Sequence, residues 1–246
     1  MPRRCARACA GADARARYVA EGAGEIIVAA GVNGAGKSTI IGRYIESIGG
    51  DYYDPDERTR ALVAAGLSRD DANARSWHEG YDALKRAIDA GSTFIFETTL
   101  GGKSVAAELF RALARGRRLT IYYVGLVSVE LHLRRVAARV ARGGHDIPEA
   151  KIRERFTSSR ENLLGFIGTQ ADIRVWDNSD DDDKGLPRPV DVLCIERNRL
   201  KYPDTPEALE TTPAWAKPLL TRALELCDLP AAFRKTSRRS KPRRVR

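Results

Sequence analysis

The sequence predicts an α/β fold of three layers (αβα), in which helices cover both faces of a parallel sheet of about five strands. Short apolar runs rich in β-branched residues alternate with longer segments of helical periodicity, and this alternation indicates right-handed βαβ units. The expected strands are a short one that begins at 51 and the segments 25–30, 92–99, 119–127 and 172–176. The expected helices are 38–48, 69–90, 103–116 and 129–142, with others that start near 57 and at 149.

A glycine-rich segment lies between the first predicted strand and the helix that follows it. It matches G-x-x-x-x-G-K-[ST] without gaps. The matching residues are Gly31, Val32, Asn33, Gly34, Ala35, Gly36, Lys37 and Ser38, followed by Thr39. Glycines let successive backbone N–H groups turn inward, and the next helix adds its positive dipole end. We expect this loop to bind the phosphates of ATP, with Lys37 on the outer phosphates and the Ser38 hydroxyl on Mg²⁺.

Two carboxylates lie at the carboxyl ends of the second and third predicted strands. Because ligands bind at the carboxyl ends of parallel strands, Asp56 and Glu97 are well placed to meet a substrate near the loop. Asp56 is explained about equally well as the N-cap of the helix that starts near Glu57. Glu97 can hold Mg²⁺ through water or bind a substrate hydroxyl, and the alternative is a surface residue at a strand end.

An arginine row lies on the helix predicted at 129–142. Arg135, Arg139 and Arg142 stand at i, i+4 and i+7, so they share one face. A solvated helix face and a lid that neutralises a transferring phosphoryl group are both consistent with this row. The glycine pair 143–144 after it suggests a mobile lid tip.

Other segments give expectations about burial. The helix 69–90 carries Trp77, Tyr81, Leu84 and Ile88 at the spacing of a buried face. Residues 177–183 are rich in acids and predict a solvated loop, and 190–196 predicts an edge strand.

The distribution of charge and the composition along the chain predict four segments. We expect a flexible basic leader (1–24), a main domain (25–200), a short helical extension (201–232) and a disordered polybasic tail (233–246). The net charge of +9 belongs to the ends, since the leader carries five arginines against two acids and residues 229–246 carry eight basic residues and no acid. Nucleic-acid contact is therefore expected only through the tail. With no membrane-spanning run or signal peptide, and four cysteines without framework spacing, we expect a cytoplasmic protein with free thiols.

Several short segments occur together in an order that resembles the zeta toxin family, in its Gram-negative-type branch of small P-loop kinases. They are the phosphate loop, the segment 54–57 with Arg60, Phe96-Glu97-Thr98-Thr99-Leu100, the arginine-rich helix, Gly143-Gly144-His145-Asp146-Ile147-Pro148, Arg153 with Arg155, and Asp177-Asn178-Ser179. The resemblance covers about residues 25–180.

The resemblance implies a P-loop kinase-like fold and ATP/Mg²⁺-dependent phosphorylation of a sugar hydroxyl on UDP-N-acetylglucosamine. It implies Asp56 as general base and Arg139 as a lid arginine, with Arg142 or Arg153 as the second one. It also implies that Arg60, Glu97, Thr98, Thr99 and His145 bind substrate, and that an antitoxin protein can block the nucleotide site.

Three other functions stay open at this point. The first is a housekeeping metabolite kinase of similar architecture. The second is a nucleotide-dependent protein that binds nucleic acid through its basic ends. The third is a regulator that binds ATP and transfers nothing.

Overall fold

The computed structural model describes residues 24–48, 52–144, 146–181 and 187–234 of the chain. Within these residues the strands form one seven-stranded sheet of order β2-β3-β1-β4-β5-β6-β7. The first five in sequence are β1 (Glu25–Ala30), β2 (Tyr52–Tyr53), β3 (Phe94–Thr98), β4 (Arg118–Gly125) and β5 (Asp172–Asp177). These five are parallel, which confirms the predicted parallel core.

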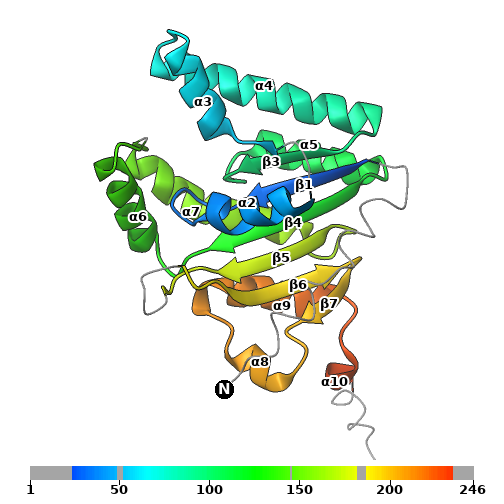
Figure 1. Ribbon diagram of the computed structural model, residues 1–246. Helices are drawn as coiled ribbons and strands as arrows, with labels where there is room; N and C mark the ends of the chain where they lie inside the picture. The colour runs from blue at the N-terminus through cyan, green and yellow to red at the C-terminus, as the bar shows by residue number, and fades with distance from the viewer. Residues whose placement is uncertain (1–23, 49–51, 145, 182–186, 235–246) are drawn as a thin grey trace, which may run out of the picture.

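Helices cover both faces of the sheet, so the fold is the predicted three-layer α/β arrangement (Figure 1). The helices of the first two thirds of the chain are α2 (Lys37–Ile48), α3 (Pro55–Ala64), α4 (Arg69–Ala90), α5 (Lys103–Ala114), α6 (Val129–Ala141) and α7 (Glu149–Phe166). After them come α8 (Pro206–Glu210), the 3₁₀ helix η1 (Ala214–Ala216), α9 (Lys217–Leu226) and α10 (Ala231–Arg234).

The alternation of side chains along β1 separates two cores. Ile26 and Val28 face a large cluster that is completed by α4, α5, α7 and α9. Ile27 and Ala29 face a smaller cluster that is completed by α2. A central strand buried on both faces is typical of a parallel sheet, and it explains why residues 26–30 are a continuous apolar run.

The register of β1 positions the functional loop. Ala30, its last residue, lies beside Thr98 of β3 and Tyr123 of β4. The loop after β1 therefore begins next to the end of β3, where Glu97 lies.

The far side of the sheet differs from expectation. Residues 190–196 do form a strand, β6 (Val190–Glu196), but they are not at the edge, because β7 (Arg199–Tyr202) pairs with their outer side. Both strands are antiparallel to their neighbours. The sequence analysis missed β7, whose four residues are too short for a visible pattern.

The C-terminal helices are part of the main core. The boundary expected between 200 and 201 falls inside β7, and Trp215, Leu219 and Ala223 of the extension belong to the large cluster. Phe233 and Arg234, expected in the disordered tail, end α10, and Phe233 packs against the same cluster. The rest of the tail and residues 1–23 of the leader lie outside the described residues.

Two expectations about helices need correction. Leu84 and Ile88 of α4 are buried as predicted, but Trp77 on the same helix is 44% exposed. The N-cap of α3 is Asp54, whose carboxylate accepts hydrogen bonds from the backbone N–H groups of Asp56 and Glu57. The cap interpretation of Asp56 is therefore wrong.

Within the described residues, no helix combines the length and the apolar character needed to cross a bilayer. Cys194 and Cys227 are buried and take part in no disulfide within the described residues, and Cys5 and Cys9 lie outside them.

Candidate active site

The loop between β1 and α2 is so closely packed that its three motif glycines, Gly31, Gly34 and Gly36, cannot be replaced without strain. Gly31 has φ +138°, and a Cβ atom there would lie 2.3 Å from the carbonyl oxygen of Val124. Gly36 has φ +90°, and a Cβ atom there would lie 2.6 Å from Nδ2 of Asn178. The glycines of the motif therefore serve both the backbone turn and the close approach of neighbouring strands.

Three side chains from other elements hold the loop in place. Nη1 of Arg155, on α7, donates to Oδ1 of Asn33 over 2.8 Å. Nδ2 of Asn178, just after β5, donates to the carbonyl oxygen of Ala35 over 2.8 Å. Nδ1 of His132, on α6, lies 2.9 Å from the carbonyl oxygen of Asn33.

His132 is a neutral structural group. Because a carbonyl oxygen only accepts, Nδ1 is the protonated nitrogen of the ring. Burial lowers the pKa of His132 to about 4, although the bond to Asn33 acts in the opposite direction. The ring therefore supports the loop without adding charge to it at neutral pH.

The reactive end of the loop meets Glu97. Nζ of Lys37 lies 3.2 Å from Oε1 of Glu97, and Lys37 is 6% exposed. The hydroxyl groups of Ser38 and Tyr52 donate to Oε2 over 2.9 and 2.8 Å. Burial alone would raise the pKa of Glu97, but Lys37 and the two hydroxyl groups lower it below its ordinary value. Burial and the neighbouring Glu97 raise the pKa of Tyr52 well above its usual range, so its hydroxyl stays a donor.

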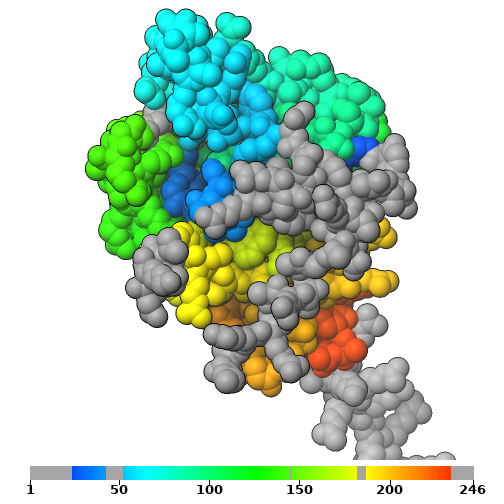
Figure 2. Space-filling model, viewed as in Figure 1, coloured from blue at the N-terminus to red at the C-terminus, as the bar shows by residue number. Residues whose placement is uncertain are grey.

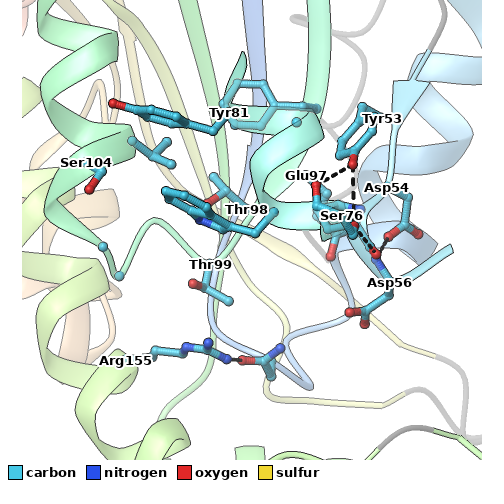
Figure 3. Close-up of a pocket in the computed structure, with 18 of the residues that line it drawn as sticks. Tyr53, Asp54, Asp56, Ser76, Tyr81, Glu97, Thr98, Thr99, Ser104 and Arg155 are labelled. Atoms are coloured by element: carbon cyan, nitrogen blue, oxygen red, sulfur yellow. Dashed lines mark hydrogen bonds between the residues drawn. The ribbon is translucent and has the colours of Figure 1, made fainter. Parts of the chain in front are cut away.

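A cavity of about 340 Å³ opens beside this network, between α3 and α4 on one side and α5 and α7 on the other (Figure 3). Its lining is rich in groups that form hydrogen bonds. The charged groups are Lys37, Asp54, Asp56, Glu97, Lys151, Glu154 and Arg155, and the hydroxyl and aromatic groups include Tyr53, Ser76, Trp77, Tyr81, Thr98, Thr99 and Ser104. Asp56, Glu97, Thr98 and Thr99, all predicted substrate residues, thus line one cavity with Lys37.

The two aspartates of the α3 turn have different tasks. Asp54 is occupied by the helix cap, and burial raises its pKa. The Asp56 carboxylate is half-exposed and lies 3.4 Å from Nη1 of Arg139 on α6. In Figure 3, Asp56 and Arg155 approach the cavity from opposite sides.

In the space-filling view, the blue atoms of the β1–α2 region lie between α3 and α6 (Figure 2).

The remaining predicted arginines lie in different places. Arg60 and Arg142 line a second hollow of about 390 Å³, together with Arg69 and Arg139. Arg135 donates to the carbonyl oxygen of Asn178 over 2.8 Å, so it has a structural contact. Arg153 pairs with Glu130 and Glu149 on the surface. His145 lies outside the described residues.

Three residues that hold the phosphate loop have no role assigned from the sequence, although Arg155 and Asn178 lie in segments that carry the family resemblance. Asn178 was expected in a solvated loop, which is wrong, because it is fully buried. The sequence feature that could have indicated the role of Asn178 is its position directly after a buried strand. Arg155 and His132 carry no local signal, since only the packing of α6 and α7 brings them to the loop.

The fold and the site together define a P-loop kinase-like nucleotide-binding domain. A family model described as an AAA domain matches residues 26–162, more than half of the chain. The chain therefore belongs to this AAA domain family.

Known proteins give further comparisons. An uncharacterized protein of Haemophilus influenzae is 30% identical over 128 residues, which are 51% of this chain and 88% of that protein. Among solved structures, AvrRxo1-ORF1:AvrRxo1-ORF2 with ATP has a TM-score of 0.59 at 13% identity, covering 92% of this chain and 83% of that one. The same pair with sulphate ions has a TM-score of 0.58 at 14% identity over the same shares of the two chains. These two likenesses support the fold.

The network around Glu97 predicts a particular loss of stability in acid. The native pKa of Glu97 is below its ordinary value of about 4.3. Its contribution is therefore complete above that value and is lost as the pH falls through the native pKa. We expect the urea midpoint of the wild-type protein to fall more between pH 6 and pH 3.5 than that of E97Q.

The matched control is E225Q, which changes an exposed carboxylate on α9 and should keep the wild-type pH dependence. Equal pH dependence of the wild-type protein and E97Q would contradict the assignment.

Proposed function

We propose that this protein is an ATP-dependent small-molecule kinase that phosphorylates a hydroxyl group of an acceptor held in the cavity of about 340 Å³. The observation that carries the proposal is the position of Asp56. Its carboxylate lines the same cavity as Lys37 of the phosphate loop and contacts Arg139 of α6. A carboxylate, an ammonium and a guanidinium group around one space are the groups that phosphoryl transfer requires.

ATP binds to the loop 31–38 in this proposal. The backbone N–H groups and the N-terminal end of α2 surround the phosphates, and Lys37 contacts the outer ones. Ser38 and Glu97 would hold Mg²⁺, since a hydroxyl and a carboxylate oxygen, 2.9 Å apart, are the hard donors that this ion prefers. The ion supplies charge neutralisation when it is bound.

Asp56 acts on the acceptor. It accepts the proton of the acceptor hydroxyl while that oxygen forms a bond to the γ-phosphorus of ATP and the bond to the bridging oxygen breaks, which releases ADP. Arg155 lines this space and Arg139 contacts the Asp56 carboxylate at its border, and in this proposal both neutralise the transferring group. Arg155 thus takes the role of second arginine for which Arg142 and Arg153 were considered.

The acceptor is a nucleotide sugar in this proposal, of the UDP-N-acetylglucosamine type. Carboxylates and hydroxyl groups in the cavity suit a polyol, and the rings of Trp77 and Tyr81, stacked 5.0 Å apart, offer an aromatic surface at the wall. The resemblance to the zeta toxin family supports the same acceptor class and an antitoxin partner. A cell whose growth is unaffected by expression of the protein would favour the housekeeping-kinase alternative.

The direct test uses ATP labelled at the γ-phosphate and a panel of nucleotide sugars, free sugars and a short RNA. We expect label to appear on a nucleotide sugar. D56N should bind ATP within about twofold of wild type and transfer label at least about a hundredfold more slowly, because the proton acceptor is lost.

The control is E57Q, which changes the exposed neighbour of Asp56 and should transfer label at the wild-type rate. Near-normal turnover of D56N would overturn the base assignment, and labelled RNA or an unlabelled panel would overturn the proposed activity.

A separate prediction concerns Arg153 and Arg155, the two arginines on α7 that could neutralise the transferring group. R155Q should lower kcat by about a hundredfold or more, since a partly buried guanidinium that lines the cavity is lost. R153Q removes only surface ion pairs and should change kcat by less than about twofold. If R153Q carries the loss and R155Q does not, Arg153 is the lid arginine.

A further inference from the structure

The segment beyond the AAA domain match contains a tryptophan that is linked to the phosphate loop through two other residues. Trp215 lies in η1, outside the matched residues 26–162, and is 7% exposed. Its Nε1 donates to Oδ2 of Asp177 over 3.1 Å. Its ring also covers Gly125 at the end of β4, where a Cβ atom would lie 2.3 Å from the indole. The indole is therefore fixed both by a hydrogen bond and by contact with the backbone of β4.

Asp177 organises the turn at the end of β5. While Oδ2 accepts from Trp215, Oδ1 accepts from the backbone N–H and the hydroxyl group of Ser179. The Ser179 hydroxyl oxygen in turn accepts from the backbone N–H of Val127 over 2.8 Å. Both carboxylate oxygens of a nearly buried aspartate are thus used to fix the backbone of 177–179.

This turn carries the residue that touches the phosphate loop. The backbone N–H of Asn178 donates to the carbonyl oxygen of Gly125 over 3.0 Å, and its side chain donates to the carbonyl oxygen of Ala35. Its Nδ2 also stands against Gly36, where no Cβ atom can fit. A small displacement of Asn178 would therefore either break its bond to Ala35 or press on Gly36.

We propose that Trp215 is a positioning residue for the nucleotide site, which acts on the phosphate loop through Asp177 and Asn178. In this proposal the C-terminal segment positions the phosphate loop and also contributes to the core. The inference rests on the proposed binding of ATP by this loop. It concerns the affinity for ATP, since Trp215, Asp177 and Asn178 do not line the acceptor cavity.

The test variant is W215F, which keeps an aromatic ring in the core and removes the indole N–H. Without that donor, one oxygen of a buried carboxylate loses its partner, and the turn is free to shift. We expect the dissociation constant for ATP·Mg²⁺, measured by calorimetry, to rise about three- to tenfold. The kcat at saturating ATP should stay within about twofold of wild type, because neither Asp56 nor Arg155 is touched.

Two further variants separate positioning from packing. D177N keeps the shape of the side chain and should weaken ATP binding in the same way, and the double variant W215F/D177N should be little worse than either single one. W176F, which removes the indole of the preceding residue on β5, should bind ATP like the wild-type protein. If W215F does not fold, D177N alone decides between the outcomes.

An unchanged affinity for ATP in W215F and D177N would overturn the inference and leave the proposed function intact, with Trp215 as a core residue only. Additive losses in the double variant would also overturn it, since the two residues would then act separately. A wild-type protein that binds no ATP would overturn the proposed function together with this inference.

Discussion

The structure depends on the close approach of the phosphate loop to the strands beside it. Gly31 passes the carbonyl of Val124 at a distance that excludes any side chain, and Gly36 meets Asn178 in the same way. Such contacts require that β1 lie beside β4 and that β5 lie on the other side of β4, as the order of the sheet has it. The loop is therefore shaped by its neighbours as much as by its own glycines. Hydrogen bonds from α6 and from the end of β5 fix its backbone, and one from α7 fixes the side chain of Asn33.

Electrostatics connects this loop to the acceptor side. Lys37 and Glu97 form a nearly buried ion pair at the border between the loop and the cavity. A triphosphate that binds at the loop shares Lys37 with Glu97, and a divalent cation between the two anionic groups would relieve their repulsion. Asp56 lies farther out, where Arg139 balances its charge. Each of these two carboxylates thus has a basic side chain beside it.

The sequence was a good guide where function and local structure coincide. The glycine motif, the parallel strands and the acids after β2 and β3 follow from short patterns, and the structure brings Lys37, Asp56 and Glu97 to one cavity. Segments whose role depends on distant partners were harder to predict. Asn178 looks like a polar loop residue until β5 is packed against β4, and Trp77 has core spacing on a helix face that borders a cavity.

The C-terminal part of the chain was also hard to predict, because its role depends on distant partners. A short strand such as β7 has no visible periodicity, and the prolines around it suggest an appendage. Only the packed structure shows that Trp215 and Leu219 belong to the main core. Arg155 is the clearest case at the site, since it is one of several arginines on α7 and is distinguished only by its contact with Asn33.

Binding of ATP by the phosphate loop can be measured by calorimetric titration of the wild-type protein and of K37M with ATP·Mg²⁺. The account predicts one site per chain in the wild-type protein, with a dissociation constant of about 1 μM to 1 mM. It also predicts an affinity at least about tenfold lower in K37M, because the buried ammonium group that contacts the phosphates is lost. A wild-type protein that shows no binding, or a K37M variant that binds as tightly, would contradict it.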